Sequence, residues 1–246
     1  MICYPNMLHN EIAGQINGDD NVAYISLPGL VKPTNEDRLE YWTQDHGMSA
    51  CIADGHWGDE AAQHAVSFWK DAGIPDSKEM AIQKTSELER ELYTSFGKPV
   101  MDQEIDLTPE TAFVGINISE DRLDIASYGD CRLLVVNGAA IKYSLEQKST
   151  WLGAFSHLGL RSRMAVKDGL VYERLPLDKE DYVIMFTDGL DECIYERPTI
   201  SHEEIAESFR LVQPKKILED LVSLAFSYGA EDNISALIYK PTFGSN

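Results

Sequence analysis

Residues 49–69 read SACIADGHWGDEAAQHAVSFW, in which an apolar, strand-like segment ends at Asp54-Gly55 and a helix-like pattern follows. The pattern is carried by small and apolar residues at helical spacing, namely Ala61, Ala62, Ala65, Val66 and Trp69. Asp-Gly by itself is a common hairpin turn. Here a helix pattern follows the pair, so a hairpin is a poor explanation. We therefore expect the carboxylate of Asp54 at the C-terminal end of a strand.

Two further Asp-Gly pairs occur in the chain. Asp188-Gly189 directly follows the apolar segment Val183–Thr187, and Asp191 and Glu192 come soon after it rather than an alternating strand, so this pair also fits a hairpin poorly. Asp168-Gly169 differs, because short apolar segments flank it closely on both sides. For this third pair we expect an ordinary hairpin turn.

Other acids occupy comparable positions. Asp130 separates two strand-like segments, Asp232 lies just before another, and Glu36 and Asp37 precede a short apolar pair. For any single acid, a solvated turn residue is the better explanation, because Asp is favoured in turns by local hydrogen bonds. The set says more than its members. Carboxylate and carbonyl oxygens without His or Cys ligand spacing suit Mg²⁺ or Mn²⁺ better than Zn²⁺.

Strand and helix signals are mixed along the whole chain, which favours one α+β domain with antiparallel hairpins. The predicted strands are Val22–Leu27, Met48–Ala53, Thr111–Ile118, Arg122–Ser127, Arg132–Val136, Tyr182–Thr187 and Ile234–Tyr239. Helices are predicted in pairs. Beyond the helix after Gly58, Asp76 and Glu79 suggest a capped start for a second one that carries Met80, Leu88, Leu92 and Phe96. Near the end, Ser201 with Glu204 opens a short helix, and Pro214 opens a longer one that stops at Gly229.

Composition excludes several classes of function. The 246 residues include 41 acidic and 21 basic ones, for a net charge of −20. Such a chain repels phosphate backbones and anionic lipid, so we expect neither a nucleic acid nor a membrane as partner. A well-solvated surface explains most of the acidity, and carboxylates gathered around cations would explain a smaller part.

The cysteines indicate a reducing compartment. Cys3, Cys51, Cys131 and Cys193 are widely spaced and form no C-x-x-C pair, as is usual for buried thiols. Residues 1–10 contain no basic region followed by an apolar stretch, so no secretory signal is visible. We therefore expect a cytoplasmic protein, although secretion without a cleaved signal stays open.

Several segments resemble, in order, the motifs of the metal-dependent protein phosphatases of serine and threonine, known as the PPM or type 2C family. Lys32–Asp37 is similar to R-x-x-N-E-D, and Ala53–Gly58 is similar to D-G-H-x-G. Thr111-Ala112, Tyr128–Arg132, Thr187–Leu190 and Glu231–Ser235 resemble G-S-T-A, G-D-S-R, S-D-G-L and D-N-I-T. One D-G-x-G would be weak, but an ordered series across nearly the whole chain is a specific signal.

The resemblance implies a single domain over residues 1–246, built as a four-layer α-β-β-α sandwich of two mostly antiparallel sheets flanked by paired helices. It also implies two core Mg²⁺ or Mn²⁺ ions and a third, weaker one. The implied metal ligands are Asp37, Asp54, the Gly55 carbonyl, Asp188 and Asp232, with Asp130 joining Asp188 at the third ion. Water activated by two cations would attack the phosphoryl group directly. Glu36 would orient that water, and His56 would protonate the leaving oxygen.

Three features depart from the family pattern. Lys32 stands where the family usually has a phosphate-binding arginine, and an ammonium binds phosphate as a point charge rather than as a two-pronged fork. The segment that would form the flap, Ser144 to Met164, is short. Trp57 occupies the variable position of D-G-H-x-G, where we expect it to pack over the following helix rather than face substrate.

The sequence therefore predicts a monomeric Mg²⁺- or Mn²⁺-dependent phosphatase of phosphoserine and phosphothreonine in proteins. A non-catalytic relative that binds a phosphoprotein is the alternative, and Lys32 is its main support. A two-metal hydrolase of another ester, such as a nuclease, is disfavoured because the acidic chain shows no basic patch. The physiological substrate and the opposing kinase stay open.

Overall fold

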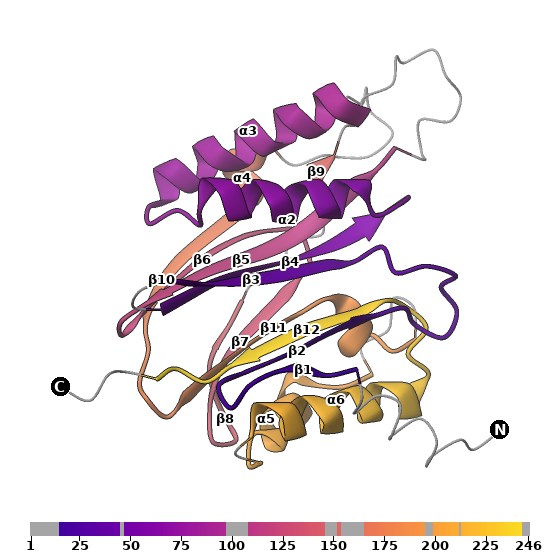
Figure 1. Cartoon of the computed structure of the whole chain (residues 1–246), viewed down its shortest axis with the longest axis vertical. Helices are drawn as coiled ribbons and strands as arrows, with labels where there is room; N and C mark the ends of the chain where they lie inside the picture. The colour runs from indigo at the N-terminus through magenta and orange to yellow at the C-terminus, as the bar shows by residue number, and fades with distance from the viewer. Residues whose placement is uncertain are drawn as a thin grey trace. The chain divides into compact units, whose positions relative to one another are not determined.

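A computed structural model describes residues 15–44, 47–96, 108–145, 152–153, 165–194, 199–211 and 213–242. The chain divides into two compact units, each with one antiparallel sheet (Figure 1). Unit 1 comprises Met1–Asn35, Arg132–Leu145 and Leu177–Asn246, and unit 2 comprises Glu36–Cys131 and Glu146–Pro176. The predicted α+β class, with antiparallel sheets and paired helices, is confirmed. A single domain over residues 1–246 stays a prediction.

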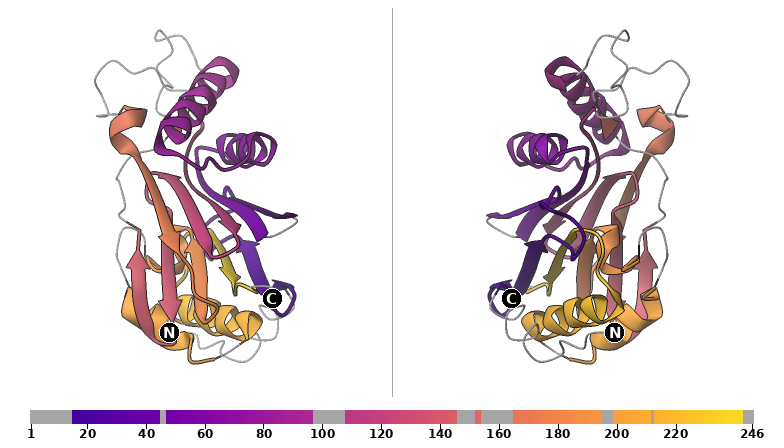
Figure 2. Two further views of the ribbon diagram at one scale, coloured as in Figure 1. Left: turned by 90° about the vertical axis from the view of Figure 1, so that its left-hand side faces the viewer. Right: turned by 90° about the vertical axis from the view of Figure 1, so that its right-hand side faces the viewer.

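Unit 2 contains the strand order β10-β6-β5-β4-β3, with β9 pairing β5. The strands are β3 (Arg38–Gln44), β4 (Gly47–His56), β5 (Glu110–Ser119), β6 (Arg122–Tyr128), β9 (Leu152–Gly153) and β10 (Leu170–Pro176). Helices α2 (Glu60–Ala72) and α3 (Lys78–Phe96), purple in Figure 2, cover one face of this sheet, and the one-turn α4 (Val166–Gly169) precedes β10. The helices are fixed by apolar burial: Trp69 of α2 is fully buried, with its ring 5.2 Å from that of Phe113 on β5.

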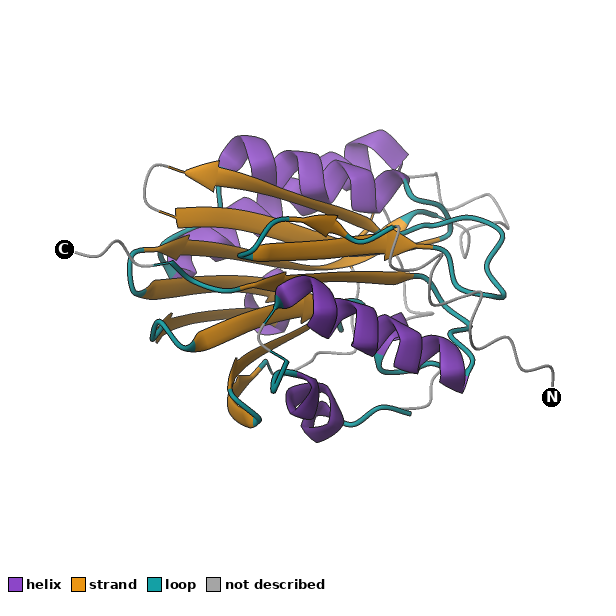
Figure 3. Ribbon diagram, turned by 60° about the horizontal axis from the view of Figure 1, so that its bottom comes forward, coloured by secondary structure: helices purple, strands orange, loops and turns teal. Residues whose placement is uncertain are grey.

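Unit 1 contains the strand order β1-β2-β12-β11-β7-β8. The strands are β1 (Asn17–Gly18), β2 (Val22–Leu27), β7 (Arg132–Asn137), β8 (Ala140–Ser144), β11 (Asp181–Phe186) and β12 (Ile234–Tyr239). Its helices are the 3-10 turn η2 (Asp188–Leu190), α5 (His202–Ser208) and α6 (Pro214–Tyr228), and Figure 3 separates helices from strands by colour. α6 buries one apolar face, made by Ile217, Leu218, Leu221, Val222 and Ala225.

Burial explains which strands the sequence reveals. β2 and β12 have the predicted bounds, and the other predicted strands differ from the observed ones by one to three residues at an end. Three strands of five or more residues were not predicted, namely β3, β8 and β10, and each lies at the edge of its sheet. An edge strand buries few side chains, so its apolar pattern is weak.

Two local predictions need correction. Asp168-Gly169 does not turn a hairpin, because it ends α4, and the strand after it pairs with β6 through Leu170 and Tyr128. Helix α3 begins at Lys78, where the Ser77 hydroxyl accepts a 3.4 Å hydrogen bond from the amide of Met80, one residue later than a cap at Asp76. Met80, predicted on the apolar face, is 46% exposed.

Helix starts with complete capping signals are confirmed. The Ser201 side chain accepts from the Glu204 amide, and the Glu204 carboxylate accepts from the Ser201 amide, which is the predicted capping box of α5. Pro214 occupies the first turn of α6, and Gly229 follows its last residue. None of the helices in the described ranges is long and apolar enough to cross a membrane.

Candidate active site

Sheet register places Asp37 beside Asp54 in unit 2. Asp54 lies inside β4, which continues through His56, so the strand does not stop at Ala53 as predicted. Arg38 pairs with Ala53 across the β3–β4 ladder, and the next step of the antiparallel register sets Asp37 against Asp54. Both side chains are almost fully enclosed, with exposures of 1% for Asp37 and 8% for Asp54. Two carboxylates held together in this way favour a bound cation.

The electrostatic surroundings of the Cys131 thiol indicate a third acid near Asp37 and Asp54. Burial raises the pKa of Cys131 well above its ordinary value, and the negative charges of Asp54, Asp130 and Asp37 raise it further, in that order of effect. A hydrogen bond to the Asp54 backbone acts in the opposite direction. Asp130 therefore lies near the other two acids, as the motif resemblance implies, and the buried thiol of Cys131 near them stays uncharged.

The loop after Asp54 is closed onto Glu36. One carboxylate oxygen of Glu36, Oε1, accepts a 2.7 Å hydrogen bond from the amide of Gly58. A Cβ atom on Gly55 would lie 2.4 Å from the carbonyl oxygen of Glu36, so only glycine fits there. The hydroxyl of Thr111 donates a 2.7 Å hydrogen bond to the carbonyl of Asp54. The segment from Asp54 to Gly58 therefore has a fixed path, with the half-buried His56 at the end of β4.

Trp57 adopts a backbone conformation that large side chains rarely occupy. Its φ angle is 63°, in the left-handed region. The side chain is 45% exposed, so the expected packing over the following helix explains only part of its position. Strain of this kind persists where neighbouring contacts impose it. Here the hydrogen bond from the Gly58 amide to Glu36 fixes the residue directly after Trp57.

Asp188 and Asp232 are held together in unit 1. Asp188 opens η2 after β11, and Asp232 lies two residues before the start of β12. The amide of Thr187 donates to the carbonyl of Ser235 at 2.9 Å, and the amide of Ser235 donates to the Thr187 hydroxyl at 3.0 Å. A Cβ on Gly189 would lie 2.0 Å from the Asn233 carbonyl oxygen. Close backbone contact therefore fixes the two turns that carry these acids.

Lys32 lies against Asp232. The Lys32 Nζ is 3.0 Å from Oδ1 of Asp232, and the same oxygen accepts a 2.7 Å hydrogen bond from the Asn233 amide. The lysine predicted to bind phosphate therefore forms an ion pair with a predicted metal ligand of its own unit. Sequence spacing does not reveal this pairing, because the two residues are far apart in the chain.

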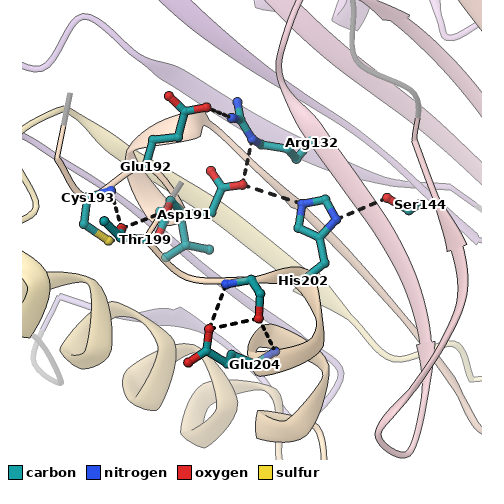
Figure 4. Close-up of polar contacts among 10 residues, drawn as sticks. Arg132, Ser144, Asp191, Glu192, Cys193, Thr199, His202 and Glu204 are labelled. Atoms are coloured by element: carbon teal, nitrogen blue, oxygen red, sulfur yellow. Dashed lines mark hydrogen bonds and ion pairs between the residues drawn. The ribbon is translucent and has the colours of Figure 1, made fainter. Parts of the chain in front are cut away.

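A polar cluster behind η2 was not predicted (Figure 4). Arg132 is 3% exposed, its Nε donates to Oδ2 of Asp191 at 2.9 Å, and its Nη2 donates to Oε1 of Glu192 at 2.5 Å. His202 adds a contact of 3.6 Å from Nε2 to the same Asp191 oxygen, and its Nδ1 lies 3.2 Å from the Ser144 hydroxyl. The available sequence signal was an arginine at the first position of an otherwise apolar strand.

The predicted ligands thus fall into two groups, with Asp37, Asp54, Gly55 and Asp130 in unit 2 and Asp188 and Asp232 in unit 1. Among the residues that the structure describes, no three His, Cys, Asp or Glu side chains of either unit are gathered closely enough to hold a metal ion. The donor chemistry does fit a hard divalent cation, because every predicted ligand offers a carboxylate or carbonyl oxygen. Most of the predicted flap, Ser144 to Met164, lies outside the described residues.

No family model matches the sequence, and no curated protein matches it either. Solved structures do match, and together with the motif series they identify the fold as that of the type 2C serine/threonine phosphatases. A bacterial serine phosphatase is similar at 14% identity, covering 93% of this chain and 100% of that one, with a TM-score of 0.71.

Two other solved phosphatases are similar in the same way. The catalytic domain of the serine/threonine phosphatase PstP, in complex with two manganese ions, is 16% identical, with 89% of this chain and 96% of that chain covered and a TM-score of 0.64. PppA of Pseudomonas aeruginosa, described as a regulatory component of a secretion system, is 19% identical over 88% and 95%, with a TM-score of 0.63. At identities this low, the likeness shows a shared fold and not a shared activity.

Proposed function

We propose that the chain is a Mg²⁺- or Mn²⁺-dependent phosphatase that hydrolyses phosphoserine and phosphothreonine in proteins. The observation that carries the proposal is the side-by-side enclosure of Asp37, just before β3, and Asp54, in β4, with Asp130 close by. Carboxylates that are buried close together repel one another, and a bound cation offsets that cost. The shared fold with solved phosphatases, one of them with two manganese ions, supports the same chemistry.

Each residue has a distinct role in this proposal. Asp37, Asp54, the Gly55 carbonyl, Asp188 and Asp232 hold the two core ions, and Asp130 with Asp188 contributes to a third. When bound, such ions acidify water and offset negative charge on a phosphoryl group.

The remaining groups of the proposed site act on the substrate and on protons. Glu36 orients the attacking water, and its carboxylate is already held by the Gly58 amide. His56 donates a proton to the departing serine or threonine oxygen, a task that suits the titration range of an imidazole. Lys32 binds the phosphate.

The test is a matched pair of substitutions in the purified chain. Asp54→Asn keeps the size of the side chain and removes one charge, and we expect it to lower kcat on a phosphopeptide by at least about 100-fold and to weaken Mn²⁺ binding in calorimetry. Asp168→Asn is the control, since it alters another Asp-Gly pair, in α4. Full activity of Asp54→Asn, or activity that survives excess EDTA, would contradict the proposal.

A second candidate is a non-catalytic phosphoprotein-binding relative, favoured by the ion pair between Lys32 and Asp232, which occupies the predicted phosphate ligand. It predicts that the chain binds Mn²⁺ and a phosphopeptide without turnover. Calorimetry with a phosphopeptide and its unphosphorylated twin, followed by a phosphate-release assay on the same sample, separates the two candidates.

A further inference from the structure

The loop that carries Lys32 is anchored along its length to the loop that carries Asp232. The Leu30 amide donates to the Ala230 carbonyl at 2.7 Å, and the Asn233 side-chain amide donates to the Thr34 carbonyl at 3.0 Å. Between these anchors, the Lys32 ammonium lies 3.0 Å from Oδ1 of Asp232. The backbone contacts fix where the side chain of Lys32 starts, so the ion pair is a built feature of unit 1.

The close approach of the two loops leaves little room for variation. A Cβ atom on Gly29 would lie 2.0 Å from the carbonyl oxygen of Asp232, so the chain must have glycine where the loops meet. Side-chain exposures of 26% for Lys32 and 17% for Asp232 place the pair at the edge of solvent. A lysine at this position can separate from its partner at little cost, because its long side chain has other rotamers in which the ammonium is hydrated.

One carboxylate thus receives two donors, the ammonium of Lys32 and the amide of Asn233, at the same oxygen. A divalent cation that binds this carboxylate removes electron density from it and repels the ammonium. The pair and the cation therefore compete. Arginine in this place would bind a carboxylate through two nitrogens and release it less readily than the single-point ammonium.

We infer that Lys32 is a counter-cation of the metal-free chain, which neutralises Asp232 until a divalent cation displaces it and frees it to bind the substrate phosphate. The inference rests on the proposed function, in which Asp232 is a metal ligand. It makes phosphate capture depend on metal binding, because the carboxylate of Asp232 and the phosphate compete for the same positive charge. The two effects are linked. The factor by which the Lys32–Asp232 pair weakens metal binding equals the factor by which the bound metal strengthens phosphate binding to Lys32.

The test is lysine acetylation footprinting of the full chain by mass spectrometry, in EDTA, then with Mn²⁺, then with Mn²⁺ and inorganic phosphate. We expect the initial labelling rate of Lys32 to rise by about 1.5- to 5-fold on Mn²⁺ addition, the range that opening a partly exposed ion pair gives, and to fall again with phosphate. Lys142 is the matched control, because it is 35% exposed and pairs with Asp178 and Asp181, which are not predicted ligands. Its labelling should stay constant.

Two substitutions complete the design. Lys32→Met should tighten Mn²⁺ binding in calorimetry by a similar factor, while Lys142→Met should leave it unchanged. Asp232→Asn should give Lys32 its fast labelling rate even in EDTA. A Lys32 rate that is unchanged or falls on Mn²⁺ addition, in a chain that binds Mn²⁺ and is active, overturns this inference alone. A chain that binds no Mn²⁺ overturns the proposed function and this inference with it.

Discussion

The Nε atom of Arg132 donates a 2.9 Å hydrogen bond to Oδ2 of Asp191, which ties the first residue of β7 to the residue after η2 (Figure 4). Both side chains are nearly enclosed, at 4% and 7% exposure. The carbonyl of Asp191 in turn accepts from the amides of Thr199 and Ile200, at 2.8 and 3.0 Å. The guanidinium therefore helps to hold in place the turn that begins with Asp188.

Arg132→Met should lower the free energy of unfolding by about 3 kcal/mol or more, because it removes the guanidinium that pairs with the buried carboxylate of Asp191. Arg122→Met is the control. Arg122 is 43% exposed, and its partner Asp124 keeps Arg174 and Tyr172 as further partners, so the loss there should stay near 1 kcal/mol or below. Urea unfolding measures the stability of both variants. Equal losses of stability would show that the buried Arg132–Asp191 pair contributes no more than the exposed Arg122–Asp124 pair.

Tyr172 should make stability depend on alkaline pH. Burial, and then the hydrogen bond that its hydroxyl donates to the Asp124 carboxylate at 2.9 Å, raise the pKa of Tyr172 from its ordinary value of 10.0 to about 12. The folded state thus keeps a proton that the unfolded state loses. The stability that this proton supplies is fully present below pH 10.0 and is lost as the pH rises toward 12.

The measurement is urea unfolding at several alkaline pH values, on the parent chain and on Tyr172→Phe. The phenylalanine variant should lose less stability over that interval. Tyr93→Phe is a control on an exposed tyrosine of α3, 49% exposed, and should follow the parent. A parent curve that matches the Tyr172→Phe curve would refute the expected link.

Trp57→Asn should leave the chain as stable as the parent or up to about 1 kcal/mol more stable, because asparagine tolerates a φ of 63° far better than a large aromatic does. Tyr93→Asn, at a similar exposure of 49% in the last turn of α3, should instead destabilise, because asparagine has a lower helix propensity. If the function proposed above is right, Trp57→Asn keeps its metal affinity. A loss of stability in Trp57→Asn larger than that of Tyr93→Asn would show that packing dominates strain.

Gly55→Ala should cost about 1–3 kcal/mol of stability, because its Cβ would lie 2.4 Å from the Glu36 carbonyl oxygen and neither backbone can yield freely. Gly73→Ala is the comparison, since no atom lies within 4 Å of its added Cβ, although its φ of 72° brings a smaller strain. Thermal unfolding of both variants gives the difference. An alanine at position 55 that is harmless would imply that the Glu36 loop moves away easily.

The elements that the sequence revealed are those whose burial follows a regular pattern. β12 is buried at every position and α6 buries a continuous face, so apolar residues mark both. β3 and β8 were not predicted because they lie at sheet edges, where few side chains are buried. The turn at Asp168 was predicted wrongly because an Asp-Gly pair between apolar residues also fits the end of a single helical turn.

Motif order selected the candidate residues, of which Asp37 and Asp54 lie side by side through the β3–β4 register and Asp188 and Asp232 lie on adjoining turns, and their roles stay predictions. Three other features could not be predicted. The partners of Arg132 and the pairing of Lys32 with Asp232 depend on contacts between distant parts of the chain. The left-handed backbone at Trp57 is imposed by its surroundings and contradicts the preference of the residue itself.

The pairing of β2 with β12 also determines the order in which the two sheets can form. The hydroxyls of Ser26 and Ser235 meet at 2.7 Å across that ladder, although 209 residues separate them. During synthesis, β3 to β6 can form one sheet as soon as they leave the ribosome, because those strands are consecutive. The other sheet must wait for β12, which fills the gap between β2 and β11. Until then two strand edges stay open to wrong partners, and a nascent chain stalled before residue 234 is the form most at risk of aggregation.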